Sequence, residues 1–318
     1  MRETPTRQNG RYDDITGWEA PGGASLCVYH KRAKGAPKAV LHINHGLGEH
    51  AGRYARFAEG LSKAGYEVYA QDHRGHGATT APDAGQGVFA GKEGWNKVLA
   101  DMKFVNGQIH DRHPDVPVVL FGHSMGAMLA YNYLLRWPNT ISAAAIWNAD
   151  LSKNPLLPVM KLILALEKLI KGPKADSLVT KLTFEAFNKA FKPNQTSCDW
   201  LSKDVDECRA YEEDPDCGWP PSVSLWRDLA SGIAYGASDK GVENLPKDMP
   251  VHLLGGDADP STRKAKATTD LAARLQAAGL RNVTTIIRKD GRHEALNEPK
   301  AERDAVTADF IAWLDKVV

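Results

Sequence analysis

The chain has 318 residues, of which 42% are hydrophobic and 25% are charged, as in an ordinary globular protein. Its 40 Lys and Arg residues against 39 Asp and Glu residues leave a formal charge of +1, so no nucleic-acid partner is expected. No apolar run reaches the roughly 18 residues that would span a bilayer, and residues 1–14 contain no apolar signal-peptide segment. We therefore expect a cytoplasmic protein, long enough for one large core with an inserted subdomain.

The cysteines are interpreted as free, buried thiols. They are Cys27, Cys198, Cys208 and Cys217. Because they show no C-x-x-C spacing and no nearby histidine in the sequence, a zinc site is disfavoured. We expect neither a metal nor another cofactor.

Strand-like and helix-like segments alternate in the first half of the chain. Strand signals occur at residues 25–32, 39–45, 66–72, 116–122 and 141–148, and helix signals at 53–65, 94–110 and 127–136. The strands are apolar on both faces. This pattern is typical of a mostly parallel sheet covered by helices.

The alternation stops between Asp150 and Ser238. That stretch begins with helix-like segments and continues into a region rich in Pro, Cys and Trp, and the strand signal then returns. The segments concerned are helices 157–172 and 179–191, strand 249–259, helix 261–279, strand 282–288 and helix 300–318. The sequence therefore predicts an α/β core, residues 1–149 and 239–318, interrupted by a helical cap, residues 150–238, which is far longer than an ordinary loop.

A serine stands between two glycines where a predicted strand meets a predicted helix. Residues 122–126 read Gly-His-Ser-Met-Gly, the pattern of a nucleophile elbow, in which small flanking residues permit a strained, exposed serine. A serine hydroxyl alone is a poor nucleophile and needs a base that is itself oriented by an acid. Ser124 is the predicted nucleophile if such partners exist.

An acid and a base follow in the chain order serine, acid, histidine. His293 is the predicted base, because it lies at the carboxyl end of the last strand, where α/β sheets bind ligands. Asp259 is the predicted acid, because the proline after it keeps its backbone extended. Asp257, read as a turn-stabilising carboxylate, and Asp150, read as a hinge or pocket residue, remain alternatives.

The mechanism also requires backbone N–H groups that face a developing oxyanion. Met125 follows the serine at a helix start, and Leu47 lies in a glycine-flanked turn after the strand 39–45, so we expect both to donate. The alternatives for that turn are an ordinary strand-to-helix connection or metal ligation by its two histidines and its glutamate. The glycines and the position favour an oxyanion loop.

Five segments together resemble the monoacylglycerol lipase and lysophospholipase branch of the α/β-hydrolase fold. They read HGLGEHAGRY, QDHRGHG, GHSMG, GDADP and GRHEALNE, in the order and spacing of that family over nearly the whole chain. The resemblance implies a mostly parallel central sheet flanked by helices, with an inserted helical cap. It also implies that Ser124 is the nucleophile, Asp259 the acid and His293 the base, with Leu47 and Met125 as oxyanion donors.

The implied activity is that of a serine carboxylic-ester hydrolase acting on monoacylglycerol, lysophospholipid or similar medium-chain lipid esters. As pocket residues we predict His123, Asp150, Leu164 and Trp219. Trp147 and Asn148 are also expected beside the pocket, where bulky and polar groups would affect the choice of acyl group.

The helix-like segment 157–172 is apolar on one side and carries lysines on the other. This pattern is typical of a cap helix packed on the core, and it also permits transient contact with a membrane surface. Rival functions are a thioesterase of the same fold and a non-catalytic small-molecule receptor. A peptidase is disfavoured because the chain has no oxyanion loop of the HGGPG type, and no oligomeric state is predicted.

Overall fold

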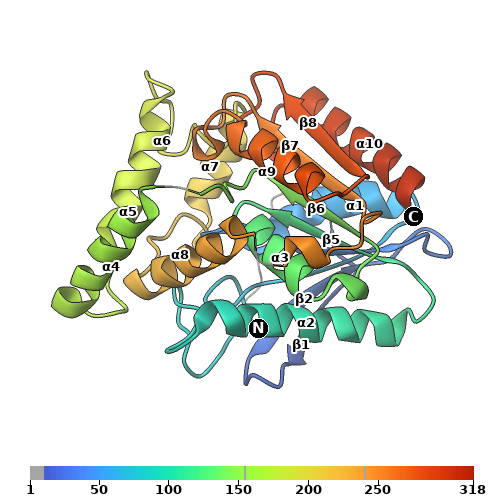
Figure 1. The fold of residues 1–318 in the computed structure, drawn as a ribbon, viewed down its shortest axis with the longest axis horizontal. Helices are drawn as coiled ribbons and strands as arrows, with labels where there is room; N and C mark the ends of the chain where they lie inside the picture. The colour runs from blue at the N-terminus through green and yellow to red at the C-terminus, as the bar shows by residue number, and fades with distance from the viewer. Residues whose placement is uncertain (1–10, 154, 240) are drawn as a thin grey trace.

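An eight-stranded sheet forms the centre of the molecule (Figure 1) in a computed structural model that describes residues 11–153, 155–239 and 241–318. Residues 1–10, where no secretory signal is predicted, lie outside the described residues. In chain order the strands are β1 Asp14–Glu19, β2 Ser25–Lys31, β3 Val40–Asn44, β4 Glu67–Gln71, β5 Val118–His123, β6 Ala143–Trp147, β7 Val251–Gly256 and β8 Val283–Arg288. Their spatial order is β1-β2-β4-β3-β5-β6-β7-β8.

The predicted mostly parallel sheet is confirmed. From β4 through β8 all neighbouring strands are parallel, whereas β2 pairs antiparallel with both β1 and β4. The edge strand β1 was not predicted, because most of its residues are exposed and it carries none of the apolar signal of a buried strand.

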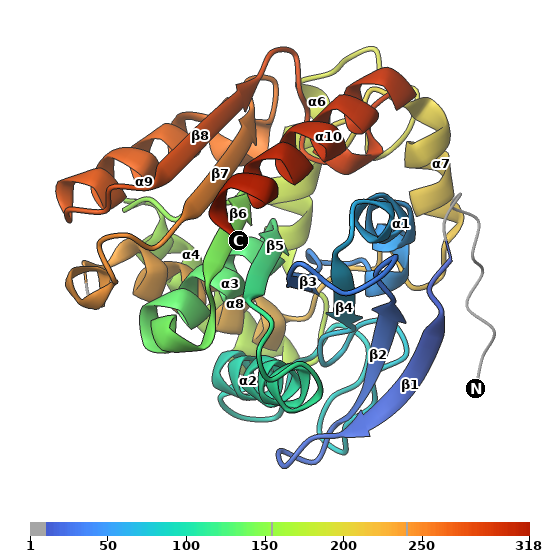
Figure 2. The ribbon, with the colours of Figure 1, turned by 90° about the vertical axis from the view of Figure 1, so that its right-hand side faces the viewer.

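Helices cover both faces of the sheet (Figure 2). The core helices are α1 Ala55–Lys63, α2 Gly94–Arg112, α3 Met125–Arg136, α9 Lys266–Ala277 and α10 Lys300–Val317. On β5, Phe121 packs with residues of α1 and α10, whereas its neighbour Leu120 packs with residues of α2, α3 and α9. Successive side chains of a strand point to opposite faces, so the two helix sets bury opposite faces of one sheet.

The segment between β6 and β7 carries further helices; the first of them lie apart from the sheet in Figure 1, whereas the last packs on α2 and α3. They are α4 Leu157–Lys171, α5 Leu178–Thr180, the π-helical turn Lys181–Glu185, α6 Ala186–Lys189, α7 Val205–Glu213 and α8 Val223–Ala237. The two helices predicted in this segment, 157–172 and 179–191, are present, and the π-helical turn interrupts the second of them. Helices α7 and α8 were missed, because the Pro, Cys and Trp residues around them obscure the helical period.

Short 3₁₀ turns complete the structure at Ala51–Tyr54, Pro138–Thr140, Val242–Asn244, Pro260–Thr262 and Ala295–Asn297. Within the described ranges, no helix has both the length and the apolar character needed to cross a bilayer. The cysteines are free thiols, as predicted, although Cys27 is only partly buried.

Candidate active site

The conformation of Ser124 explains the glycines around it. Ser124 joins β5 to α3 with φ 54° and ψ −120°, a strained conformation of the kind stored at functional sites. A Cβ atom on Gly122 would lie 2.3 Å from the carbonyl oxygen of Gly126, and one on Gly126 would lie 2.1 Å from the carbonyl oxygen of Asn44. Since these are backbone contacts that cannot rotate away, only glycine fits at both positions.

Ser124, His293 and Asp259 form a hydrogen-bonded chain. His293 Nε2 lies 2.9 Å from Ser124 Oγ, and His293 Nδ1 lies 2.9 Å from Asp259 Oδ2. The three residues follow β5, β7 and β8, whose carboxyl ends meet at one edge of the parallel sheet. This arrangement has the geometry in which a base can accept the serine proton while a carboxylate orients its ring.

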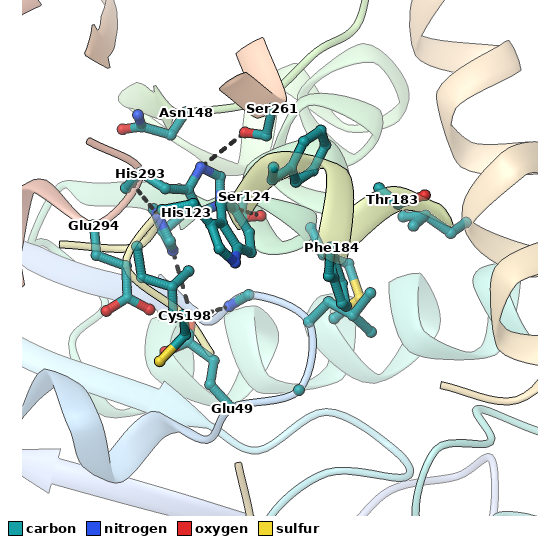
Figure 3. Close-up of a pocket in the computed structure, with 18 of the residues that line it drawn as sticks. Glu49, His123, Ser124, Asn148, Thr183, Phe184, Cys198, Ser261, His293 and Glu294 are labelled. Carbon is teal, nitrogen blue, oxygen red and sulfur yellow. Dashed lines mark hydrogen bonds and ion pairs between the residues drawn. The ribbon is translucent and has the colours of Figure 1, made fainter. Parts of the chain in front are cut away.

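The surroundings of Asp259 keep its carboxylate ionised. Burial alone would raise the pKa of Asp259, but the charge of His293 and hydrogen bonds from His293, Asn148 and Ser261 outweigh burial and lower it to about 2. Asn148 Nδ2 donates to Oδ2 at 3.0 Å, and Ser261 donates to Oδ1 through its backbone N at 2.9 Å and its Oγ at 2.7 Å. Figure 3 shows Ser261 directed at His293. Ser261 was not predicted as part of the site, whereas Asn148 was expected beside the pocket.

The alternative acids lie elsewhere. Asp257 is exposed and accepts a hydrogen bond from the backbone N of Asp290 at 2.6 Å, which is the turn-stabilising role considered for it. Asp150 forms an ion pair with Arg263 at 3.0 Å. The structure therefore brings Asp259, rather than Asp257 or Asp150, to the imidazole of His293.

The turn predicted as an oxyanion loop borders the same cavity as Ser124. Leu47 and Met125 both line this cavity, as do Gly46, Gly48 and Glu49. The backbone N of Gly46 donates to Glu49 Oε1 at 2.6 Å. This bond fixes the start of the loop, so the loop is held in place before a substrate arrives.

A buried ionic network connects that loop to the loop of His293. Arg53 Nη1 contacts Glu49 Oε2 at 2.5 Å, and the Arg53 guanidinium pairs with both carboxylate oxygens of Glu294 at 2.7 Å. Burial would raise the pKa of Glu49, but Arg53 and His123 hold it well below the usual range. Sequence reasoning missed Arg53 and Glu294, although both stand inside the HGLGEHAGRY and GRHEALNE segments.

His123 forms a second link between the two loops. Its Nε2 donates to the carbonyl oxygen of His293 at 2.9 Å, and its Nδ1 lies 3.4 Å from Glu49 Oε1. Burial would lower the pKa of His123, but the hydrogen bond and the charge of Glu49 raise it. Both ring nitrogens therefore have acceptors, and the ring positions the backbone of the base.

A cavity of about 670 Å³ opens over Ser124. The sheet side contributes Ser124, His293 and the loop that carries Leu47, and the predicted cap contributes mainly apolar side chains. The apolar lining residues of the cap include Leu156, Leu157, Met160, Phe184, Phe187, Trp200, Trp226, Leu229 and Ile233. Figure 3 shows Phe184 on the cap side of the cavity and His293 on the sheet side. The cavity thus combines an apolar volume with a polar floor, as small-molecule sites commonly do.

Two of the predicted pocket positions require correction. Leu164 is completely buried in the hydrophobic core and is not among the lining residues, because it lies on the inner side of α4. Trp147 points to the opposite face of the sheet, where it packs on Phe121 and Phe310. Of the other predicted positions, His123, Asp150 and Trp219 do line the cavity.

Residues 200–201, in the predicted cap, contact His293 directly. The ring of Trp200 lies 4.7 Å from that of His293, and the backbone N of His293 donates to the carbonyl oxygen of Trp200 at 3.3 Å. The backbone N of Glu294 likewise donates to Leu201 at 2.7 Å. This contact was not predicted, since nothing in the sequence pairs residues 200–201 with the loop after β8.

The fold, with this site at the carboxyl edge of its sheet, places the chain among the α/β-hydrolases, and comparison with known proteins makes it a carboxylic ester hydrolase. The chain belongs to the Hydrolase_4 family, whose model, described as "Serine aminopeptidase, S33", matches residues 35–300.

Named relatives support the ester-hydrolase assignment. The chain is 27% identical to a monoacylglycerol lipase of Mycolicibacterium smegmatis over 87% of this chain and 88% of that protein. It is 29% identical to monoglyceride lipase of Mus musculus over 81% of this chain and 77% of that protein. A thermostable carboxyl esterase from Bacillus coagulans, solved with glycerol, shares the fold with a TM-score of 0.85 at 22% identity, covering 96% of this chain and 98% of that one.

Proposed function

We propose that the protein hydrolyses monoacylglycerols, lysophospholipids or similar medium-chain esters through an acyl-enzyme on Ser124. The observation that carries this proposal is the chain of 2.9 Å contacts from Ser124 through His293 to Asp259 at the floor of an apolar cavity. The monoacylglycerol lipase relatives support the choice of substrate class. The division into a core and a cap over residues 150–238 belongs to the same proposal.

In the proposed mechanism, His293 Nε2 takes the proton of Ser124 as Oγ attacks the ester carbonyl. The N–H groups of Leu47 and Met125 stabilise the oxyanion of the tetrahedral intermediate. His293 then gives the proton to the departing alcohol oxygen, which leaves an acyl group on Ser124. Water, activated by the same base, releases the carboxylic acid and restores the serine.

The two sides of the cavity suit the two parts of such a substrate. The apolar cap residues, among them Met160 and Phe184, can shelter an acyl chain, while Glu49 and Glu294 provide polar groups for a hydroxylated head group. Each sheltered methylene contributes about 0.8 kcal/mol. We therefore expect acyl length to be recognised by the cap.

The outer side of α4 supports a further element of this proposal, transient contact with a membrane surface. Its large exposed apolar residues are Val159, Leu162, Leu166, Leu169 and Ile170, followed by Leu178 and Leu182 beyond α4. An apolar helix face flanked by lysines favours insertion at the boundary between head groups and acyl chains. A cytoplasmic location remains a prediction.

Ser124→Ala tests the mechanism. We expect it to lower ester hydrolysis by on the order of a thousandfold or more while leaving the fold intact, and to abolish labelling by a fluorophosphonate. Retention of a tenth of the activity would remove Ser124 from the mechanism. An oxyester and a thioester of the same acyl chain should be compared, since faster thioester cleavage would favour the thioesterase alternative, and ligand binding without turnover would favour the receptor.

A further inference from the structure

A turn of the cap, residues 214–218, sits directly on the loop that carries the proposed oxyanion donor. The backbone N of Gly218 donates to the carbonyl oxygen of Gly48 at 2.9 Å. His50 Nε2, at the end of the same loop, lies 3.0 Å from Asp214 Oδ2. Two segments far apart in the sequence therefore meet beside the cavity, and Cys217 lies within the turn.

We propose that His50, Asp214 and Cys217 form a site for a thiophilic divalent cation such as Zn²⁺. One donor atom from each residue lies within 4.8 Å of the other two. Bonds of about 2.0–2.3 Å to a tetrahedral ion place its donors roughly 3.3–3.7 Å apart, so small side-chain movements suffice to close the site. The imidazole, carboxylate and thiolate donors are those that Zn²⁺ prefers.

The sequence argues against such a site, because no histidine stands near the cysteines along the chain. The fold supplies one from the other side of the domain boundary. His50 and Cys217 are buried, and Asp214 is largely so. A site of this kind joins the core to the cap through three protein donors. Because Cys217 also lines the cavity, the fourth coordination position of the ion can face the cavity.

The charges at the site balance. Zn²⁺ displaces the proton of the Cys217 thiol and, where His50 is charged against Asp214, the extra proton of that imidazole; both protons leave to solvent, so that one thiolate and one carboxylate neutralise the ion and His50 binds as a neutral ring. The nearby Arg53 does not leave an uncompensated positive charge, because Glu49 and Glu294 both pair with it.

Cobalt substitution tests the site without reference to catalysis. The full-length protein is stripped with a chelator, kept under reducing conditions and titrated with Co²⁺. We expect one equivalent to give a thiolate-to-cobalt charge-transfer band that Zn²⁺ abolishes by competition. Cys217→Ser should eliminate the band, and Asp214→Asn should weaken Co²⁺ binding by at least about tenfold.

Cys208→Ser is the matched control, because Cys208 is another buried cap thiol and should leave the band unchanged. Circular dichroism verifies folding, and His50→Asn provides a variant on the core side in case Cys217→Ser does not fold. The proposal is overturned if the wild type gives no such band, if Cys217→Ser retains it, or if Cys208→Ser loses it equally.

Discussion

The sheet and the cap bury their apolar side chains to different degrees. Every residue of β3, β4, β5, β6 and β7 is buried. In α4, by contrast, Leu164 and Glu167 are the buried residues, while Leu162 is 62% exposed and Leu169 is 84% exposed. The exposed apolar side chains of α4 therefore contribute little of the stabilising free energy that their burial would provide.

This difference in burial matches two roles: the sheet holds the proposed catalytic residues in place, and the predicted cap covers the cavity. The proposed nucleophile, acid and base sit on short turns at the ends of buried strands, and a rigid scaffold holds such geometry well. The predicted cap forms the apolar roof of the cavity, and residues 199–202 tie it to the loop of His293 through the backbone bonds of Trp200 and Leu201 and the side chain of Arg292. Away from these residues the roof can change without moving those turns. Substitutions on the two sides should therefore fail in different ways.

The largest effect should come from the acid on the sheet side. Asp259→Asn should lower kcat by on the order of a thousandfold or more, because the amide cannot stabilise an imidazolium or keep the correct tautomer of His293. Asp257→Asn is the control, since Asp257 is exposed and bonds to the turn at Asp290. Ester hydrolysis by the two folded variants should be compared, and equal losses would contradict the assignment of Asp259.

The sequence predicted the sheet side better than the cap, for a physical reason. Buried parallel strands are short apolar runs, and the elbow requires Gly122 and Gly126 at fixed positions, so both leave a local signal. The contacts that complete the site are nonlocal: Arg53 reaches Glu294, and Trp200 packs on His293. No periodicity within a segment reports such pairs.

The error at Leu164 has the same origin. The helical period shows that α4 has an apolar stripe, but more than one side of the helix is apolar, and the period does not say which side meets the core. The structure resolves this, because Leu164 is buried whereas its neighbours Leu162 and Leu166 are exposed. The position expected to select substrates is therefore a structural one.

A carboxylate introduced on the buried side of α4 should affect stability, whereas the same carboxylate on the exposed side should affect lipid binding. Leu164→Glu should lower the free energy of unfolding by roughly 3 kcal/mol, because it places a carboxylate in an apolar core. Leu162→Glu should change it by less than about 0.5 kcal/mol but reduce flotation with lipid vesicles. Urea denaturation and vesicle flotation measure the two effects, and equal destabilisation by both variants would contradict the difference in burial.

Substitutions in the roof of the cavity should change the preference for acyl-chain length more than the rate of the chemical step. Met160→Ala should lower kcat/KM for lauroyl esters by about tenfold relative to acetyl esters, since its loss removes contacts worth roughly two methylenes. Leu162→Ala, on the outer side of the same helix, should leave the ratio unchanged. A uniform fall across all lengths for Met160→Ala would mean that this residue supports the triad instead.

The smallest expected effect is the pH dependence of the free energy of unfolding that His123 contributes. Because Glu49 raises the pKa of His123 in the folded protein, His123 contributes stability that is fully present below the unfolded pKa of about 6.5. That contribution is lost as the pH rises through the raised value. Relative to His123→Gln, which keeps a donor for the His293 carbonyl, the wild type should therefore lose stability as the pH increases.

His113 provides a control of opposite sign. Burial lowers its pKa, so the wild type should gain stability relative to His113→Gln as the pH rises through the unfolded pKa of about 6.5. Free energies of unfolding in urea, measured from about pH 5 to pH 9, test both slopes. A difference between wild type and His123→Gln that does not vary with pH would show that folding leaves the pKa of His123 unchanged, and a wild type that gains stability as the pH rises would show that His123 is neutral when folded. Glu49 would then hold the oxyanion loop through Arg53 and Gly46 alone.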